Sequence, residues 1–303
     1  MSEPGTQTRF GFAAIVGAPN AGKSTLVNAL VGAKVTIVSR KVQTTRAPIR
    51  GIAIAGMSQI VFVDTPGIFA PRRRLDRAMV DAAWTGAKDA DEVVLVVDAH
   101  KGIDADVDRI VEGLRDRKPA PVLVLNKVDT MRKDSLLALT QVLNERIGFA
   151  RTFMISALTG SGVDDLKAHL AAAMPPGPWH YAEDEISDAP QRLLAAEIVR
   201  EKIYDRLHDE LPYAITVETT SWSDLKDGGA RIEQTIFVER DSQRSIVLGK
   251  GGRTIKLISM TAREELAQLL ERPIHLFLFV KVREGWEHDP ERYREMGLDF
   301  PKE

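Results

Sequence analysis

The sequence predicts an α/β protein, with a doubly wound, mostly parallel sheet followed by a smaller α+β domain. Short apolar runs alternate with helical patterns through the first half of the chain. A glycine-rich loop directly follows the first of these runs. A proline-rich acidic stretch then separates this alternating half from a second half with another order of elements. The chain has 303 residues, which is enough for two domains of ordinary size.

Five apolar runs of the first half are predicted strands, and several are apolar on both faces, as buried parallel strands are. They are Phe10–Val16, Gln59–Asp64, Asp91–Ala99, Pro121–Lys127 and Arg151–Ser156. The predicted helices between them are Lys23–Val31, Ile103–Arg117, Ser135–Ile147 and Val163–Ala173. Right-handed crossovers would place ligands at the carboxyl ends of these strands.

The domain boundary is predicted within Met174–Pro190, which holds four prolines and an acidic run. The predicted divisions are a first domain over 9–176, a linker over 177–190, a second domain over 191–286 and a tail over 287–303. The second domain is predicted to contain helix Gln191–His208, strands Tyr213–Trp222 and Ala230–Arg240, a short helix, helix Arg253–Leu270 and strand Ile274–Val282.

Composition limits the class of protein. The chain has a net charge of −2 and no cysteine, so disulfides and thiolate metal sites are excluded. No apolar run approaches a membrane span and the N-terminus has no signal core, which predicts a cytoplasmic protein. The part beyond residue 180 is net acidic, but no acid occurs between Ser242 and Ala262. Basic residues do occur there, so the local positive charge of this stretch is more informative about a nucleic-acid partner than the net charge of the chain.

The loop "GAPNAGKST" has the spacing of a phosphate-binding loop and lies between a predicted strand and a predicted helix. Its backbone N–H groups and the helix dipole favour a phosphate. Lys23 supplies a positive charge, and the Ser24 hydroxyl supplies an oxygen ligand for Mg²⁺. The predicted nucleotide-contacting residues of this loop are Gly17, Ala18, Pro19, Asn20, Ala21, Gly22, Lys23, Ser24 and Thr25.

Three later motifs follow successive strands and indicate a guanine nucleotide. "DTPG" would bring Asp64 to Mg²⁺ and the Gly67 amide to a γ-phosphate. "NKVD" brings Asp129, whose carboxylate can accept two hydrogen bonds from guanine, which adenine cannot donate. "ISAL" offers the Ala157 amide to guanine O6. These motifs add Asp64, Thr65, Pro66, Gly67, Ile68, Asn126, Lys127, Asp129, Ser156, Ala157 and Leu158 to the predicted contacts.

With these four motifs, the first half resembles a translation-factor-type GTPase domain, a P-loop fold that binds GTP or GDP with Mg²⁺. The resemblance implies that a threonine of "VSRKVQTTRAP" binds Mg²⁺ and senses the γ-phosphate. We choose Thr45, with Thr44 as the alternative, so that the predicted metal ligands are Ser24, Thr45 and Asp64. The predicted catalytic residues are Lys23, Thr45, Gly67 and Asn20.

Two features of this half concern catalysis. Ile68 stands where Ras-like enzymes place a glutamine that orients the attacking water, so unaided hydrolysis is expected to be slow. Asn20 resembles the asparagine that binds K⁺ in potassium-stimulated GTPases. The alternative for Asn20 is a residue that simply suits a tight turn.

The second glycine loop, "VLGKGGRTIKLI", lacks the Gly-Lys-Ser/Thr ending of the first. It contains G-x-x-G between a short helix and a longer one, which resembles the KH fold, and the order of elements resembles its type-II form. Glycines let a nucleic-acid backbone approach, and apolar side chains around Ile246, Val247 and Ile255 would form the base groove. The predicted RNA-binding residues are Gly249, Lys250, Gly251, Gly252, Arg253 and Lys256.

The whole arrangement resembles the Era family of bacterial ribosome-assembly GTPases, from Phe10 to about Trp286. The resemblance implies binding to the 3′ end of 16S rRNA and to the 30S subunit during its maturation. We also expect a monomer, and a peripheral contact with the inner face of the membrane. Two alternatives stay open: an RNA-binding protein with a structural nucleotide, and a GTPase whose C-terminal domain contacts protein or membrane.

Overall fold

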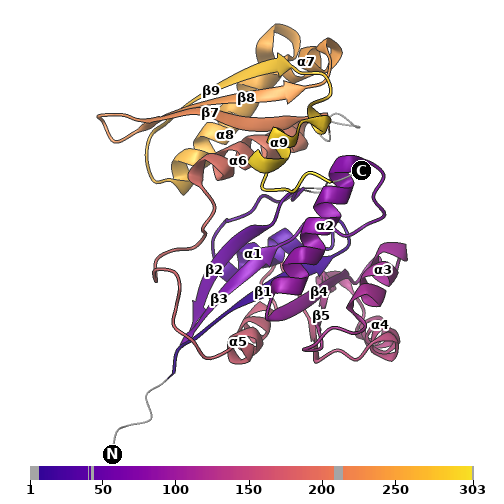
Figure 1. Cartoon of the computed structure of the whole chain (residues 1–303). Coiled ribbons are helices and arrows are strands. Elements are labelled where there is room, and N and C mark those ends of the chain that lie inside the picture. Colours follow the sequence, from indigo (N-terminus) through magenta and orange to yellow (C-terminus); the bar gives the residue numbers. More distant parts are fainter. Residues whose placement is uncertain (1–6, 40, 42–43, 208–213, 302–303) are drawn as a thin grey trace, which may run out of the picture. The chain divides into compact units, whose positions relative to one another are not determined.

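The computed structural model describes residues 7–39, 41, 44–207 and 214–301, which form two compact units (Figure 1). The first unit comprises the chain up to Thr36, Thr45–Asp188 and the chain from Tyr293. The second unit comprises Ile37–Thr44 and Ala189–Arg292.

The first unit is built on a six-stranded sheet in the order β2-β3-β1-β4-β5-β6. All neighbouring strands are parallel except β2 and β3, which are antiparallel. The predicted doubly wound, mostly parallel fold is therefore confirmed. The strands are β1 (Arg9–Gly17), β2 (Ile49–Ala55), β3 (Ser58–Asp64), β4 (Glu92–Asp98), β5 (Val122–Asn126) and β6 (Arg151–Met154).

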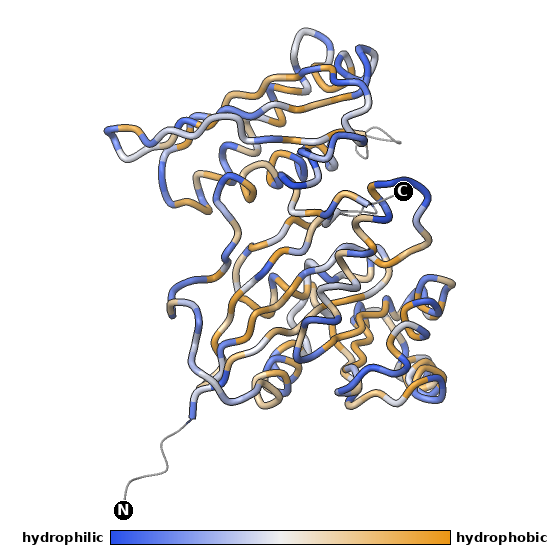
Figure 2. The backbone as a smooth tube through the Cα atoms, in the orientation of Figure 1, coloured by the Kyte–Doolittle hydropathy of each residue, from blue (hydrophilic) through white to orange (hydrophobic). Residues whose placement is uncertain are grey.

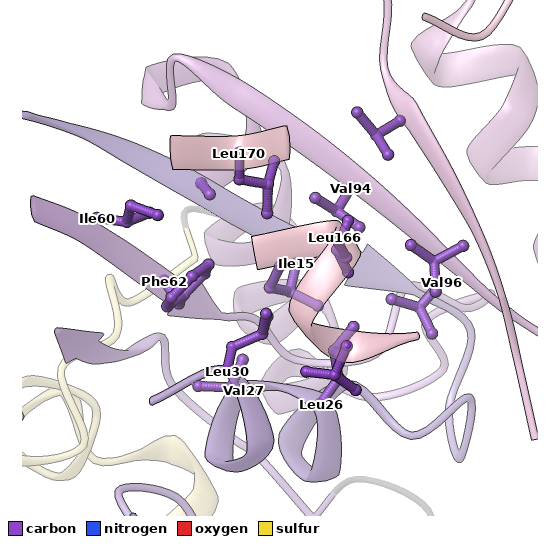
Figure 3. Close-up of a cluster of buried hydrophobic side chains, with 14 of the residues drawn as sticks. Ile15, Leu26, Val27, Leu30, Ile60, Phe62, Val94, Val96, Leu166 and Leu170 are labelled. Atoms are coloured by element: carbon purple, nitrogen blue, oxygen red, sulfur yellow. The ribbon is translucent and has the colours of Figure 1, made fainter. Parts of the chain in front are cut away.

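Helices cover both faces of this sheet and bury one hydrophobic core on each. They are α1 (Lys23–Val31), α2 (Arg74–Asp89), α3 (Ala105–Leu114), α4 (Lys133–Arg146) and α5 (Val163–Ala173). Figure 3 shows the core under α1 and α5, a single cluster that includes Leu26 of α1, Leu166 of α5, and Ile15 and Phe62 of the sheet. The second core lies under α2, α3 and α4. Figure 2 shows the strands coloured mostly as hydrophobic, as strands covered on both faces should be.

Two elements of this unit were not predicted from the sequence. Strand β2 is the antiparallel edge strand, and its short apolar run contains a glycine at Gly51. Helix α2 begins at the last of three consecutive arginines, and its N-cap is Arg73 instead of a Ser, Thr, Asp or Asn. Asp76 caps it instead, because its Oδ2 accepts the amides of Arg72 and Arg73 at 3.1 and 3.0 Å.

The second unit has the predicted order of helix, strand, strand, helix, helix and strand, and its three-stranded sheet has the order β7-β8-β9. Strand β8 is antiparallel to β7 and parallel to β9. The elements are α6 (Gln191–Arg206), β7 (Thr216–Asp224), β8 (Ala230–Val238), α7 (Asp241–Leu248), α8 (Arg253–Leu269) and β9 (Ile274–Val282). His208 and Tyr213, predicted ends of a helix and a strand, lie outside the described residues. The boundary between the second unit and the last part of the first unit falls within helix α9 (Pro290–Glu295), between Arg292 and Tyr293.

The stretch predicted as a linker lies along β2 and β3 of the first unit. Gln59 Oε1 accepts the amides of His180 and Tyr181, both at 3.0 Å. The Ile52 amide donates to the Ile186 carbonyl at 2.8 Å. The predicted domain limits stay predictions. Within the described ranges, no helix is long and apolar enough to cross a bilayer.

Candidate nucleotide site and nucleic-acid interface

The first glycine loop lies between β1 and α1 and is tightly enclosed by its neighbours. A Cβ atom on Gly17 would come within 2.4 Å of the Val96 carbonyl oxygen. Gly22 has a φ of +94°, and a Cβ there would come within 2.3 Å of Asn126 Nδ2. Only glycine fits such positions, so the loop backbone can curve ahead of the first amides of α1.

Lys23 is the buried cation of this loop, with a side chain that is 6% exposed. Its Nζ donates to the carbonyls of Gly17 at 3.2 Å and Ala18 at 3.0 Å. Burial lowers the pKa of Lys23 to about 8, although the Asp64 carboxylate opposes this change. An anionic phosphate would stabilise the charged ammonium in this place.

Three hydroxyl groups converge on the Asp64 carboxylate at the end of β3. Asp64 Oδ2 accepts from Ser24 at 2.8 Å, Thr36 at 2.9 Å and Thr45 at 3.0 Å. The Ser24 and Thr45 hydroxyl oxygens are 3.0 Å apart. The structure thus brings together the three predicted metal ligands. Thr44, the alternative to Thr45, instead donates to the Lys41 carbonyl at 2.8 Å.

The chemistry of this cluster fits Mg²⁺. Asp64 is fully buried, and its Oδ1 has no hydrogen-bond partner within the described part of the chain. Burial raises the pKa of Asp64, against the opposing effects of Lys23 and the hydroxyl groups. An unsatisfied carboxylate oxygen beside hydroxyl oxygens is a suitable donor set for a hard cation. Thr36 was not predicted, because it lies in an apolar run without a motif.

The Gly67–Ile68 turn lies against the first glycine loop. A Cβ on Gly67 would come within 2.9 Å of Pro19 Cγ, and the Ile68 amide donates to the Gly17 carbonyl at 3.1 Å. The Ile68 side chain is fully buried in the core under α2. Ile68 therefore contributes its backbone to the loop, and its side chain belongs to the core.

The "NKVD" motif ties the end of β5 to the first glycine loop. Asn126 Nδ2 donates to the Ala21 carbonyl at 2.9 Å. Lys127 Nζ donates to the Asn20 carbonyl at 2.7 Å and to Asp98 Oδ2 at 2.6 Å. The sequence reading missed Asp98, although a charged residue at the end of the buried strand β4 was an available signal.

The predicted base-binding residues lie around the same strand end. Asp129, in a short 3₁₀ turn (Val128–Thr130), is exposed to solvent. The Ala157 amide, predicted to face guanine O6, donates in this structure to Asn126 Oδ1 at 3.0 Å. Ser156 is buried and Leu158 is 83% exposed. The backbone at Asn20 has a φ of +64°, which suits a tight turn.

The second glycine loop differs in its surroundings. It joins α7 to α8 through a 3₁₀ turn (Lys250–Gly252). Gly249, Gly251 and Gly252 have φ values of +72°, +63° and +74°. A Cβ on Gly251 or Gly252 would meet no described atom within 4 Å. Gly251 and Gly252 are therefore needed for their backbone conformation and lie at an open surface, whereas a Cβ on Gly249 would come within 2.2 Å of Thr254 Oγ1.

Exposed cations surround this loop. Lys250, Arg253 and Lys256 are all exposed, and the first turn of α8 contains no acidic residue. Ile246 is 54% exposed and Ile255 is half-buried, so both are available for a base groove. The prediction was wrong for Val247, which is fully buried in the core of this unit. The helical period of α7 turns Val247 inward, one position from Ile246.

Comparisons with known proteins agree with this geometry. A family model described as a 50S ribosome-binding GTPase matches residues 12–127, and a KH domain model matches residues 210–287. The proteins named GTPase Era from Bradyrhizobium sp. and Sinorhizobium medicae are 66% and 65% identical to the chain. These alignments cover 99% and 97% of this chain, and 97% and 95% of the relatives.

Solved structures show the same similarity. A crystal structure of Era in complex with MgGDPNP and nucleotides 1506–1542 of 16S ribosomal RNA has a TM-score of 0.90 and 36% identity. A variant of Aquifex aeolicus Era bound to GDP·AlF4⁻ has the same two values. Each comparison covers 96% of this chain and 99% of the other.

A phosphate loop on a doubly wound sheet, joined to a type-II KH unit, defines a P-loop GTPase with an RNA-binding domain attached. Full-length similarity to curated relatives then identifies the family. The chain belongs to the GTPase Era family.

Proposed function

We propose that this protein is a GTP-hydrolysing switch that binds the 3′ end of 16S rRNA through its KH unit and acts in maturation of the 30S subunit. The main support is the Era structure described as holding both MgGDPNP and nucleotides 1506–1542 of 16S rRNA, which matches this chain over 96% of its length. The chain has both glycine loops that such ligands require.

Different residues of the first unit bind the phosphates, the guanine base and Mg²⁺. Lys23 places its charge at the β- and γ-phosphates, and Asp129 selects guanine. Mg²⁺, held through Ser24, Thr45 and Asp64, neutralises charge that develops on the phosphates. The Gly67 amide would donate a hydrogen bond to the γ-phosphate. Because the Ile68 side chain is packed in the core, it cannot orient the attacking water, and we expect intrinsic hydrolysis to be slow.

The chain passes from the nucleotide site into the second unit and back between Thr36 and Thr45. Thr36 and Thr45 both hydrogen-bond to Asp64, whereas the intervening Ile37–Thr44 belongs to the second unit. Ile37 is fully buried in the core of that unit. Ordering of Thr45 by GTP and Mg²⁺ would therefore reach the second unit along the chain, and by reciprocity RNA binding would change the affinity for the nucleotide.

Several finer points stay predictions. A carboxamide oxygen at Asn20 suits K⁺, and its backbone conformation equally suits a turn. The cytoplasmic location, the monomeric state and a peripheral contact with the inner face of the membrane also stay predictions. K⁺ dependence is tested by the hydrolysis rate in KCl and NaCl at equal ionic strength.

The proposed switch is tested by measuring RNA affinity in two nucleotide states. The probe is an RNA of nucleotides 1506–1542 of 16S rRNA, titrated into the full chain with GDP and then with GDPNP. We expect tighter binding with GDPNP, and faster GTP hydrolysis when the RNA is present. Equal affinities would support the alternative of a structural nucleotide. Absence of RNA binding in both states would favour a KH unit that contacts protein or membrane.

A further inference from the structure

The C-terminal segment, Tyr293–Pro301, belongs to the GTPase unit, although the preceding residue, Arg292, belongs to the KH unit. The chain turns at the end of α9, where the Leu298 amide donates to the Tyr293 carbonyl at 2.7 Å. Gly297 makes the turn possible, because its φ of +74° lies in the left-handed region. The turn brings the residues after Gly297 back onto the GTPase unit.

The C-terminal segment packs on α2, the helix that follows the Gly67 turn (Figure 1). Tyr293 and Leu298 are 0% and 3% exposed. The rings of Tyr293 and Phe300 meet edge to face, with 4.9 Å between their centroids. The Arg74 guanidinium, in the first turn of α2, lies 4.9 Å from the Phe300 ring centroid. This cation–π contact fixes the start of α2 to the segment.

The same segment lies beside the chain that follows Thr45. A Cβ on Gly297 would come within 3.8 Å of the Ala47 Cβ. A cavity of about 590 Å³ is lined by Leu298 of the segment, by Ala78 and Ala82 of α2, and by Pro48. The C-terminal segment thus lies against both stretches that follow the predicted γ-phosphate residues, Thr45 and Gly67.

The residues just before the segment are anchored in the KH unit. Arg292 pairs with Glu218 and lies 5.1 Å from the Phe237 ring centroid. Trp286 is fully buried, and its Nε1 donates to the Ala214 carbonyl at 3.1 Å. Arg292 and Tyr293 are consecutive, so no slack chain separates the two anchors.

We propose that Tyr293, Leu298 and Phe300 are positioning residues for GTP hydrolysis. They hold the first turn of α2, and through it the Gly67 turn, in the arrangement that aligns the attacking water. This chain needs such support because Ile68 provides no side chain for that purpose. The anchored Arg292 makes the segment a route by which RNA on the KH unit changes the hydrolysis rate. The inference rests on the proposed GTPase function.

The test uses Phe300→Ala and Leu298→Ala in the full chain, with Leu137→Ala as the matched control. Leu137 is 62% exposed on α4 of the same unit. Steady-state hydrolysis is measured with and without the RNA of nucleotides 1506–1542. We expect kcat to fall about tenfold, with KM changed less than about twofold, because alignment is lost and not binding. We also expect most of the stimulation by RNA to be lost.

Two further variants protect the test against loss of folding. Phe300→Tyr keeps the ring over Arg74, so its kcat should stay near that of the wild type, unlike that of Phe300→Ala. Arg74→Lys keeps the charge and all apolar burial of the segment but loses the planar contact, and should lower kcat by about two- to threefold. Unchanged kcat and unchanged RNA stimulation in Phe300→Ala and Arg74→Lys would overturn the inference. A wild-type protein that does not hydrolyse GTP would instead overturn the proposed function.

Discussion

The two glycine loops have similar composition and opposite surroundings. In the loop at Gly17–Ser24, Gly17 and Gly22 lie close against a neighbouring backbone or side chain, and Lys23 is buried. In the loop at Gly249–Gly252, the last two glycines face open space and the neighbouring cations are exposed. The enclosed loop suits one desolvated phosphate group held with a metal ion. The open loop suits a sugar–phosphate chain that passes over the surface.

The comparison predicts that the same substitution has very different effects in the two loops. Gly17→Ala would put a methyl group against the Val96 carbonyl oxygen, which cannot move away without shifting β4. We expect GDP affinity to fall by about 100-fold or more. Gly251→Ala meets no neighbouring atom and should leave GDP affinity unchanged. Titration with a fluorescent GDP analogue measures both, and equal losses would refute the contrast.

Removing the charge at Asp64 should affect the metal more than the nucleotide. Asp64→Asn keeps an oxygen acceptor for the hydroxyl groups and removes the carboxylate charge. The Mg²⁺ concentration required for tight GDP binding should rise by about 100-fold. Nucleotide affinity in EDTA serves as the control, since it should not change. An unchanged Mg²⁺ requirement would contradict the assignment of the metal site.

Removing the cations of the open loop should weaken RNA binding in a salt-dependent way. The test variant changes Lys250, Arg253 and Lys256 together to Ala. Each lost phosphate contact should reduce the slope of log affinity against log salt concentration by about 0.7, so the three losses together should reduce it by about 2. Affinity at physiological salt should fall between about tenfold and 100-fold. The matched control changes Lys88, Arg109 and Arg115 of the first unit to Ala. The same loss in both variants would mean that only net charge matters.

The smallest expected effect is the pH dependence of nucleotide binding, which comes from the lowered pKa of Lys23. Between pH 7 and 8.5 the free protein begins to lose this proton, because its pKa is about 8. Phosphate binding favours the protonated lysine, so GDP affinity should fall by up to a few fold over this range. Calorimetry in buffers of different ionisation enthalpy should detect proton uptake at pH 8.5. Absence of uptake would show that Lys23 is not desolvated as described.

The sequence predicted the parts of the molecule whose chemistry is local. The phosphate loop, the strands that precede each motif and the order of elements in the KH unit follow from spacing and alternation within short windows. Thr36 could not be assigned in this way, because its role arises from a contact with Asp64, far away in the sequence. Asp98 has a local signal as the charged end of a buried strand, but the sequence does not show that its partner is Lys127. Val247 was placed wrongly, because α7 is short and its core-facing side depends on the sheet beneath it.

The position of the C-terminal segment could not be predicted from the sequence either. "RYREMGLDF" contains a glycine that favours a turn, but the sequence does not indicate which surface these residues pack against. Its Phe300 contacts Arg74, which is more than 200 positions earlier in the sequence. Contacts of this kind depend on the complete fold.

The central claim is that the two loops hold different phosphates, and one variant tests it most directly. Gly252→Asp places a negative charge in the open loop, at the start of α8. Binding of GTP and of the 1506–1542 RNA is measured on the same preparation. We expect RNA affinity to fall by at least about 100-fold, while GTP affinity stays within about twofold of the wild type. Unchanged RNA binding, or an equal loss for both ligands, would contradict the claim.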